Sequence, residues 1–460
     1  MKVSHDQLAR QLESALGAGA VTNEPSLLAS HSVDERPPAL VCAPETAEQI
    51  AAALRICSEV EAAVTTWGGG AAMRIGNLPR KLDVVLGLNL LNRVIEHDAA
   101  NLTLTVQAGI SLTDLRESAA DQKQFLPFDA PHPSRATVGG TIAANLNGPR
   151  RSSYSAVRDL VIGMKVALAS GEQIKAGGKV VKNVAGYDMC KLFVGSLGTL
   201  GIITEATLRM SPVPQTAATL VATGTPLSVT DLANELARSQ LTPTAVFISN
   251  SQANESETLA RFGRTCPEPV EGGKGEGVLK EIDRANDTWQ LAVWSEGFEE
   301  NVHRHLRDVQ ATAERIGLKL DWLRDESHQQ YWNEIRDFPL RSERLIYRVT
   351  VPRAAVTEVM KAIADWKTAD FDPAIVSDAA VGTIWIAAAA NRASVEQFPK
   401  LITLARERDG HAVTFAGPPS CKQGVDVWGS LPPGFSLMRE IKRQFDPKGI
   451  LNPGRFLGGI

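Results

Sequence analysis

The stretch from Gly177 to Pro214 constrains this chain more than any other, because it carries three glycines at every third position. Gly195, Gly198 and Gly201 lead directly into the β-branched run at 202–204. Glycine permits positive φ and close backbone approach, so the pattern suits a tight helix-to-strand connection laid against a flat ligand. Taken alone, the spacing favours a simpler structure, a helix packed on a strand with glycines for clearance. The two prolines that end the stretch cannot donate to a sheet ladder, so the sheet is expected to stop there.

The composition is that of an ordinary globular protein, and 460 residues are enough for two or more domains. The hydrophobic fraction is 43%, the charged fraction is 22% and the formal net charge is −4. This balance gives no indication of nucleic acid or an anionic membrane as a partner. The N-terminal leucines recur at helical spacing, unlike a secretory signal, and no apolar window reaches the roughly 18 residues of a spanning helix. We therefore expect a cytoplasmic protein without a transmembrane segment.

The cysteines are five in number and far apart, with no CxxC pair. Structural zinc sites and iron–sulfur clusters need clustered thiolates, and disulfides are rare in the cytosol. We expect reduced cysteines that serve packing, and no metal site. Any iron–sulfur centre that receives electrons would then lie on another chain. The cysteines are Cys42, Cys57, Cys190, Cys266 and Cys421.

A run of small residues at 68–72 follows a strand-like VTTW segment. Consecutive free amides in such a run form a nest that can receive a pyrophosphate without any lysine. A simple glycine turn is the alternative. The run is not a Rossmann fingerprint, because Met73 replaces the third glycine, and the chain contains no GxxxxGK[ST] loop.

A second run of small residues, at 136–148, has Gly139 and Gly140 at its centre. A helix that begins at Thr141 would direct its N-terminal amides at a ligand held on this glycine pair. Close packing of helix on sheet also favours glycine and alanine, and is the alternative.

Three motifs resemble the FAD-binding domain of the vanillyl-alcohol-oxidase type flavoproteins, which is the PCMH type. They are KNVAGYD at 182–188 followed by GSLGTLGIITEATL at 195–208, and FDPKGILNPG at 445–454. The order Thr-Val-Gly-Gly, Asn-Leu-Asn-Gly, Pro-Arg-Arg and Val-Arg-Asp within 137–159 resembles in particular the E subunit of bacterial glycolate oxidase. The likeness runs from about 34 to 214 and resumes in the final fifty residues.

The resemblance implies an α+β fold in two lobes. A helical extension at 1–33 would precede an FAD-binding domain at 34–214, built of two small α/β subdomains with FAD between them. Residues 215–460 would form a cap and substrate domain, an antiparallel sheet with helices, whose C-terminal loop returns to the cofactor.

The resemblance also implies FAD as the cofactor. Some relatives attach the flavin to a histidine in or near the first glycine loop, and none occurs between Val64 and Leu86, so noncovalent FAD is expected. The residues expected to bind it are Gly68, Gly69, Gly70, Ala71, Ala72, Pro131, Thr137, Gly139, Gly140, Ala144, Asn145, Gly148, Arg158, Lys182, Asn183, Ile203 and Asn452.

As a function, the resemblance implies the FAD-binding subunit of a glycolate oxidase type complex. Such a subunit would oxidise a 2-hydroxy acid, glycolate or D-lactate, and pass electrons through flavin to an iron–sulfur subunit, with a second flavoprotein subunit as a further partner. It would lie in the cytoplasm or be held at the inner membrane through those partners. Relatives that oxidise D-2-hydroxy acids alone carry a histidine-rich metal motif, and the second half here has only four scattered histidines.

The sequence identifies no catalytic base. Arg348, on a strand expected at 345–351, is a candidate for holding the substrate carboxylate, and an edge-strand arginine with a solvated head is the alternative. Two other functions therefore stay open. One is a self-sufficient FAD-dependent 2-hydroxy-acid dehydrogenase, and the other is a non-catalytic scaffold subunit.

Overall fold

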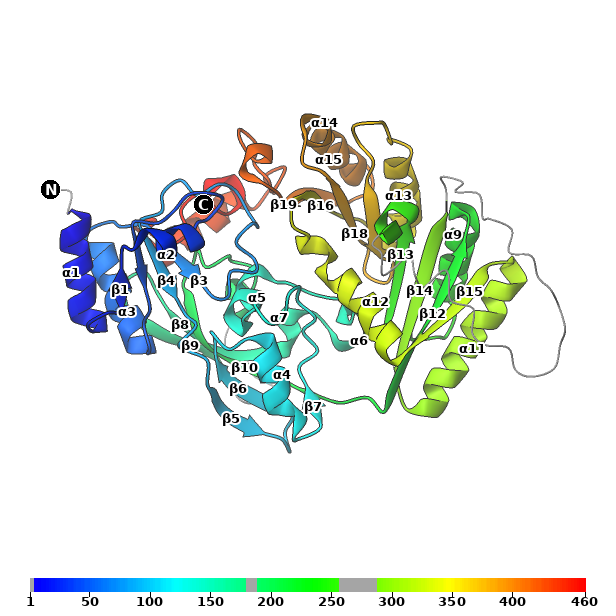
Figure 1. Ribbon diagram of the computed structural model, residues 1–460, viewed down its shortest axis with the longest axis horizontal. Helices are drawn as coiled ribbons and strands as arrows, with labels where there is room; N and C mark the ends of the chain where they lie inside the picture. The colour runs from blue at the N-terminus through cyan, green and yellow to red at the C-terminus, as the bar shows by residue number, and fades with distance from the viewer. Residues whose placement is uncertain (1–3, 179–187, 256–287) are drawn as a thin grey trace.

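The computed structural model describes residues 4–178, 188–255 and 288–460, and has helices and strands in two halves joined by the chain near 210–216 (Figure 1). In the described residues the first half holds two larger sheets and a two-stranded one, β11-β7, and the second half holds one large antiparallel sheet. The α+β class expected from the sequence is confirmed. The division at 1–33, 34–214 and 215–460 stays a prediction.

The first sheet has the order β1-β2-β4-β3, and its two inner pairs, β2–β4 and β4–β3, are parallel. Two of its helices have side-chain caps: Ser4 accepts a hydrogen bond from the Gln7 amide, and Thr46 and Gln49 form a reciprocal capping box. The elements are α1 (His5–Leu16), β1 (Val21–Thr22), α2 (Pro25–Ser30), β2 (Leu40–Cys42), α3 (Ala47–Glu59), β3 (Val64–Trp67) and β4 (Val84–Gly87).

The second sheet is antiparallel, with the order β5-β6-β10-β8-β9. Its strands are β5 (Val94–Asp98), β6 (Thr103–Gln107), β8 (Val161–Ala167), β9 (Gln173–Gly177) and β10 (Ile202–Arg209), and α4 (Leu112–Ala120) follows β6. The predicted helix-to-strand connection is confirmed: α8 (Cys190–Phe193) leads through Gly195 and Gly198, both at positive φ, into β10. The five-stranded sheet stops at Arg209, although the chain pairs for two more residues as β11 (Ser211–Pro212) with β7 (Gln124–Phe125).

The charged run around His97 forms the edge strand β5, paired with β6. The Nε2 atom of His97 lies 3.0 Å from Oε1 of Gln124. An edge strand with an exposed face tolerates charge, so its composition resembles that of a loop.

The third sheet has eight antiparallel strands in the order β15-β12-β14-β13-β17-β18-β16-β19. Its strands are β12 (Thr216–Gly224), β13 (Ala245–Asn250), β14 (Trp289–Gly297), β15 (Lys319–Arg324), β16 (Arg344–Thr350), β17 (Ala374–Asp378), β18 (Thr383–Ala389) and β19 (His411–Ala416). Its helices are α9 (Pro226–Arg238), α11 (Glu299–Ile316), α12 (Asp325–Asp337), α13 (Val356–Ala364) and α15 (Phe398–Arg406).

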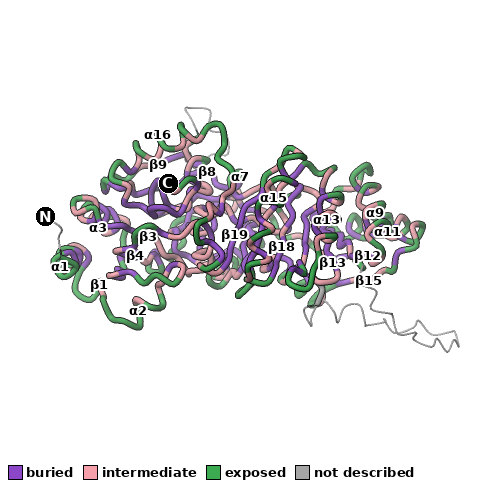
Figure 2. Tube along the Cα trace, turned by 90° about the horizontal axis from the view of Figure 1, so that it is seen from above, coloured by how far each residue is buried: buried purple, intermediate pink, exposed green. Residues whose placement is uncertain are grey.

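Successive side chains of each strand point to opposite faces of this sheet, so each face packs against a different group of helices. On β13, Val246 and Ile248 pack in one core with α9, α11, α13 and α15. Phe247 points to the other face and packs in the core that contains α12 and the first half of the chain. The sheet is therefore covered on both faces. Every residue of the central strand β13 is buried, and Figure 2 draws buried residues in purple. Its second face is the one that meets the first half.

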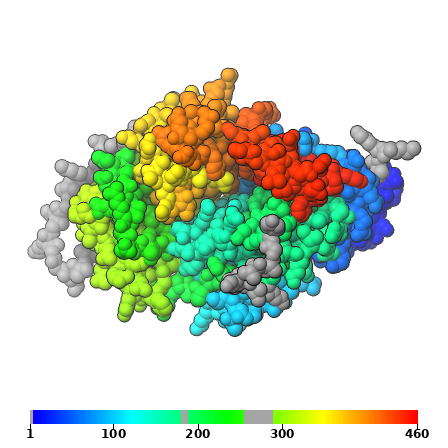
Figure 3. All heavy atoms as spheres, turned by 180° about the vertical axis from the view of Figure 1, so that it is seen from behind, coloured from blue at the N-terminus to red at the C-terminus, as the bar shows by residue number. Residues whose placement is uncertain are grey.

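The C-terminal segment returns to the first half, as predicted from its motif. Seen from behind, it lies between the N-terminal region and the late part of the second half (Figure 3). After α16 (Phe435–Phe445), the carboxylate of Asp446 accepts hydrogen bonds from the amides of Ile450 and Leu451 and so folds the loop back. The loop then pairs with β3, because the Val64 amide donates to Ile450 and the Asn452 amide donates to Val64. Asn452 is thereby fixed beside the small-residue loop that follows β3.

Helices long and apolar enough to cross a bilayer are absent from the described residues.

Candidate functional site

A pocket of about 870 Å³ lies between the loop at 68–73, the helix α5 (Val138–Ala144) and the segment at 197–203. The two small-residue loops meet here, as expected. A Cβ atom added at Gly69 would lie 1.8 Å from the carbonyl oxygen of Arg135, and one at Gly68 would lie 2.3 Å from Oγ1 of Thr137. Only glycine allows this approach of the two loops, so the pocket depends on the glycine run.

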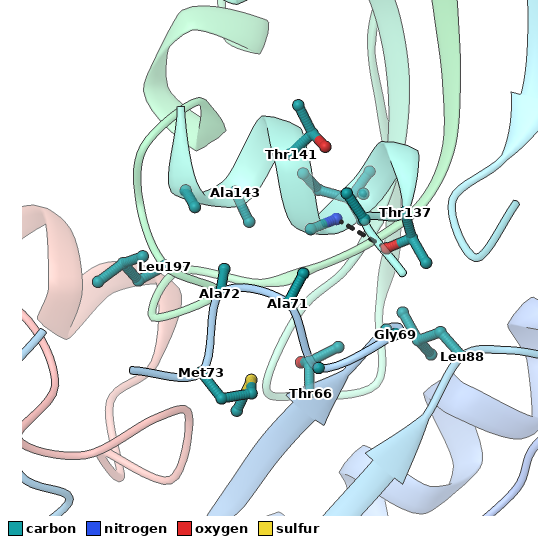
Figure 4. A pocket seen from close by; sticks show the side chains of 18 of the residues that line it. Thr66, Gly69, Ala71, Ala72, Met73, Leu88, Thr137, Thr141, Ala143 and Leu197 are labelled. Carbon is teal, nitrogen blue, oxygen red and sulfur yellow. Dashed lines mark hydrogen bonds between the residues drawn. The ribbon is translucent and has the colours of Figure 1, made fainter. Parts of the chain in front are cut away.

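The loop at 68–73 supplies unsatisfied backbone donors to the pocket. Within the described residues, none of its six amides donates a hydrogen bond. The side chains of Ala71 and Ala72 point toward α5, whereas Met73 points away from it (Figure 4). These residues are partly buried, and a run of free amides in a concave loop favours a bound anion.

The second glycine pair plays a different part from the one predicted. The helix α5 begins at Val138, three residues before Thr141, because Thr137 caps it through a 3.2 Å hydrogen bond to the Gly140 amide (Figure 4). The Gly139 amide donates to the carbonyl of Ala108 at 2.8 Å, and a Cβ at Gly139 would lie 2.8 Å from the Ala108 side chain. Both amides are thus occupied, and Gly139 serves the close packing that was the alternative.

Two polar atoms at this pocket are buried without hydrogen-bond partners. Asn452 donates through Nδ2 to the carbonyl of Leu197 at 2.6 Å, and its Oδ1 accepts no hydrogen bond from any residue that the structure describes. The hydroxyl of Thr141 likewise has no partner among those residues. Each such group costs about 1–3 kcal/mol if it stays unsatisfied. Free amides, unpartnered polar atoms and a small-residue lining together fit a dinucleotide with a diphosphate.

A buried cluster of charges supports the loop from behind. The Asp34 carboxylate accepts hydrogen bonds from Lys422 Nζ at 2.8 Å and from an Arg455 guanidinium nitrogen at 2.5 Å, and these side chains are 0–5% exposed. Arg455 also donates to the carbonyls of Met73 and Ile75. Burial lowers the pKa of Lys422 to about 8.

With Lys422 charged, two cations share one carboxylate, and the remaining positive charge favours an anion in the pocket that Arg455 lines. The sequence analysis did not find this cluster. Its members, Asp34, Lys422 and Arg455, are far apart in the sequence, so no local motif contains them.

A second pocket, of about 1040 Å³, adjoins the first. Leu146 lines both pockets, and the consecutive residues Ala144 and Asn145 line the first and the second respectively. The floor is the second face of the large sheet, and the roof is the segment at 145–151 with part of α12. The floor includes one row of paired residues across five strands, namely Phe247, Asp378, Thr383, Thr350 and His411.

Arg348 lies in the same floor, next to that row. It is on β16, which pairs with β18 on one side and β19 on the other, so it is not an edge-strand arginine. Its Nε is buried without a hydrogen-bond partner, and its guanidinium lies 5.2 Å from the ring centroid of Phe415 and 5.8 Å from that of Trp385. Burial, with a smaller contribution from Arg151, lowers the pKa of Arg348 to about 10. An unpartnered cation in a pocket is suited to bind a carboxylate.

The structure gathers most of the predicted site residues into these two pockets. Pro131, Asn145 and Gly148 line the second one. Arg158 lines neither and is exposed on α7 (Val157–Leu160), because the two apolar ends of that turn face the core. Lys182 and Asn183 lie outside the described residues. The first pocket is lined by Gly68, Gly69, Gly70, Ala71, Ala72, Thr137, Gly139, Gly140, Ala144, Ile203 and Asn452.

Four of the cysteines, Cys42, Cys57, Cys190 and Cys421, are buried with free thiols, and Cys266 lies outside the described residues. Burial raises the pKa of Cys57 to about 12. Across 4–178, 188–255 and 288–460, no three His, Cys, Asp or Glu side chains are grouped so that they could hold a metal ion.

Comparison with known proteins identifies two family matches. Residues 38–177 match the FAD binding domain, and residues 430–456 match the C-terminal domain of the FAD linked oxidases. The first match contains the loop at 68–73 and α5, and the second contains Asn452 and Arg455, whereas the pocket segment at 197–203 lies in neither.

Curated relatives cover nearly the whole chain. Glycolate oxidase subunit GlcD of Bacillus subtilis is 28% identical over 437 residues, which are 91% of this chain and 88% of the relative. Glycolate oxidase subunit GlcE of Escherichia coli is 26% identical over 368 residues, which are 79% and 84%. Among solved structures, p-cresol methylhydroxylase with substrate bound superposes with a TM-score of 0.72 at 17% identity, over 98% of this chain and 96% of that one.

Proposed function

The chain is an FAD-linked oxidoreductase with FAD as its cofactor, and we propose that it oxidises a 2-hydroxy acid, glycolate or D-lactate, to the 2-keto acid. The observation that carries the proposal is the pair of adjoining pockets. One is lined by free amides and fits the cofactor, and the other presents the unpartnered guanidinium of Arg348.

Noncovalent FAD would be held in the first pocket by residues of three segments. The free amides at 68–73 would receive the diphosphate, backed by the positive charge that Lys422 and Arg455 leave uncompensated. Asn452 and Thr141 would satisfy their unpartnered oxygens on the cofactor. When bound, FAD supplies the acceptor for a hydride and its electron pair.

The substrate would occupy the second pocket with its carboxylate on Arg348. A guanidinium presents paired N–H donors that match a carboxylate, and such charge-assisted hydrogen bonds are among the strongest in proteins. The rings of Phe415 and Trp385 confine the guanidinium, so little side-chain entropy remains to be lost on binding. Leu146, which lines both pockets, would place the substrate next to the cofactor.

Anaerobic reduction of the purified protein tests this function. The yellow protein, mixed with glycolate or D-lactate in the absence of oxygen, is expected to lose its flavin absorbance and to yield glyoxylate or pyruvate in equal amount. L-lactate and acetate serve as controls for configuration and for the hydroxyl group. A protein that retains its absorbance with every 2-hydroxy acid contradicts the proposal.

Within this function, we favour an FAD-binding subunit of a glycolate oxidase type complex over an enzyme that works alone. The names of the relatives support it, since two of them are glycolate oxidase subunits. Electrons would leave the flavin for an iron–sulfur subunit, with a second flavoprotein subunit in the same complex and a cytoplasmic location that only the partners connect to a membrane. Steady turnover of the isolated chain with an artificial acceptor, and no co-purifying flavoprotein or iron–sulfur chain, would instead support the self-sufficient dehydrogenase.

A further inference from the structure

From the floor of the second pocket we infer that Asp378 is the catalytic base, which takes the proton from the C2 hydroxyl of the substrate bound on Arg348. This inference rests on the proposed oxidation of a 2-hydroxy acid. It supplies the group for which the sequence offered no candidate.

The register of the sheet places Asp378 and Arg348 on one face. Asp378 pairs with Thr383, which pairs with Thr350, two residues from Arg348 on the same side of β16. The two residues are therefore separated by two strand spacings across the sheet and two residues along it, roughly 12 Å between their main chains. That span accommodates the arginine side chain, a two- or three-carbon acid and the aspartate side chain. The carboxylate of the substrate would meet Arg348 while its hydroxyl points to Asp378.

The local structure holds Asp378 in place and leaves it available. It ends β17 at a tight turn that Gly382 closes at positive φ, and its Oδ1 accepts a 3.1 Å hydrogen bond from the Ala380 amide. The residue is only 4% exposed, and in the described part of the chain it makes no ion pair. Burial raises the pKa of this carboxyl to about 7. A carboxylate of this strength is matched to proton transfer near neutral pH.

The charged groups that face this carboxyl come from four elements. They are Arg151 at the start of α6 (Arg151–Tyr154), Arg336 on α12, Arg348 on β16 and His411 on β19. Arg336 is engaged by Asp337 at 2.9 Å, and His411 is exposed at the sheet edge. Asp378 is thus the one carboxyl that lines this pocket among the described residues.

The proposed step balances as follows. The O–H bond of the C2 hydroxyl breaks and its proton passes to the Asp378 carboxylate. The hydrogen on C2 would leave with the electron pair of the C2–H bond, as a hydride that bound oxidised FAD would accept. The C2–O bond then becomes a carbonyl. The substrate is oxidised by two electrons and the cofactor is reduced by two, so no further reactant is needed.

Stopped-flow reduction of the full-length flavoprotein tests the assignment. For Asp378→Asn the rate of flavin reduction by D-lactate is expected to fall by about 100- to 10,000-fold, the usual contribution of a positioned base. In the wild-type protein the rate is expected to rise with pH through about 7, and the variant should lose this rise. The asparagine keeps the acceptor for the Ala380 amide, so the fold is preserved. The matched variant Asp372→Asn, at an exposed aspartate that lines neither pocket, is expected to reduce at close to the wild-type rate.

Oxalate binding, measured by calorimetry on the same proteins, provides a readout that does not depend on turnover. Wild-type affinity is expected to weaken as pH rises through about 7, because the ionised Asp378 repels the anion, whereas the affinity of Asp378→Asn should vary much less. If D-lactate and glycolate fail to reduce the wild-type protein but this difference is seen, the proposed substrate is wrong and the ionisation of Asp378 in the pocket stands. Equal reduction rates for Asp378→Asn and wild type, or an equal fall in Asp372→Asn, overturn the inference.

Discussion

Two buried ionisable side chains, Arg348 and Asp378, determine the chemistry available to the second pocket. Neither makes an ion pair within the described residues, and burial shifts the pKa of each toward its neutral form. A buried charge without a partner destabilises a fold, so such residues persist where function requires them. The stability that each buried charge costs the fold can be measured separately from its role in binding or proton transfer.

Asp378→Asn is expected to change the pH dependence of stability. The folded pKa of this carboxyl, about 7, lies above the ordinary aspartate value of 3.8, so the folded protein favours the protonated form. The free energy of unfolding of the wild-type protein, measured against that of the asparagine variant, is therefore highest at low pH. It falls as pH rises from about 4 to 7 and is constant above that. The full difference would approach about 4 kcal/mol. Urea unfolding of both proteins at pH 5 and pH 8 is expected to show about 3 kcal/mol of this loss, since two of the pH units lie in that interval, and parallel curves would contradict the assigned pKa.

Arg348→Met is expected to weaken the binding of oxalate by roughly 10- to 100-fold, because charge-assisted hydrogen bonds contribute about 1.5–3 kcal/mol. The free energy of unfolding should stay the same or rise, since methionine fills a similar space between the two aromatic rings and removes an unpartnered charge. Calorimetry and thermal unfolding measure the two effects. The control is Arg392→Met, at a side chain that is 92% exposed on α14 (Arg392–Val395), which should alter neither.

At the scale of elements, the first pocket is made where β3, α5 and the C-terminal loop converge. The strand ends in a loop without side-chain bulk, Thr137 caps the helix against it, and Asn452 enters from the far end of the chain. Each element contributes backbone or small side chains, so the pocket is formed by the absence of Cβ atoms as much as by the groups present.

Gly69→Ala is expected to separate the loop from α5, because the new Cβ would lie 1.8 Å from the Arg135 carbonyl. Overpacking of this kind costs about 1–3 kcal/mol, and a similar loss in FAD affinity corresponds to roughly 10- to 100-fold. Flavin fluorescence during titration of the apoprotein measures the affinity. Gly434→Ala, at a position with no atom within 4 Å of the new Cβ, is the matched control, and equal affinities in the two variants would refute the packing argument.

At the scale of the molecule, two buried ion clusters hold the halves and the C-terminus together. Arg150 bonds to Asp129 in its own half at 2.9 Å and to Glu296 of the large sheet at 3.0 Å. The Asp34 cluster joins the N-terminal half to Lys422 and Arg455, near the end of the chain. Because both pockets lie between segments that these clusters join, the clusters are expected to control whether the site is assembled.

Asp34→Asn is expected to reduce the free energy of unfolding by about 3–5 kcal/mol, since it leaves two buried cations without a carboxylate. Backbone strain cannot explain such a loss, because Asp34 has φ of 48° and asparagine adopts that region readily. Asp325→Asn, at an exposed aspartate with φ of 46°, is the control and should change stability by less than about 0.5 kcal/mol. Equal stabilities of the two variants would contradict the structural role of the cluster.

The sequence by itself determined the local features. The capping pairs at Ser4 and Thr46, the turn through Gly195 and Gly198, and the bare loop after β3 follow from conformational preferences of a few neighbouring residues. The motif at 445–454 likewise folds through its own Asp446.

Only the tertiary structure decided which of these features meet. The assignment of Gly139 to packing, the outward position of Arg158 and the pairing of β5 depend on neighbours distant in sequence. Asp378 could not be distinguished from other aspartates, because its burial and its row with Thr350 exist only once β16, β17 and β18 are in register. Desolvation and proximity are properties of the assembled fold, and no local pattern of residues encodes them.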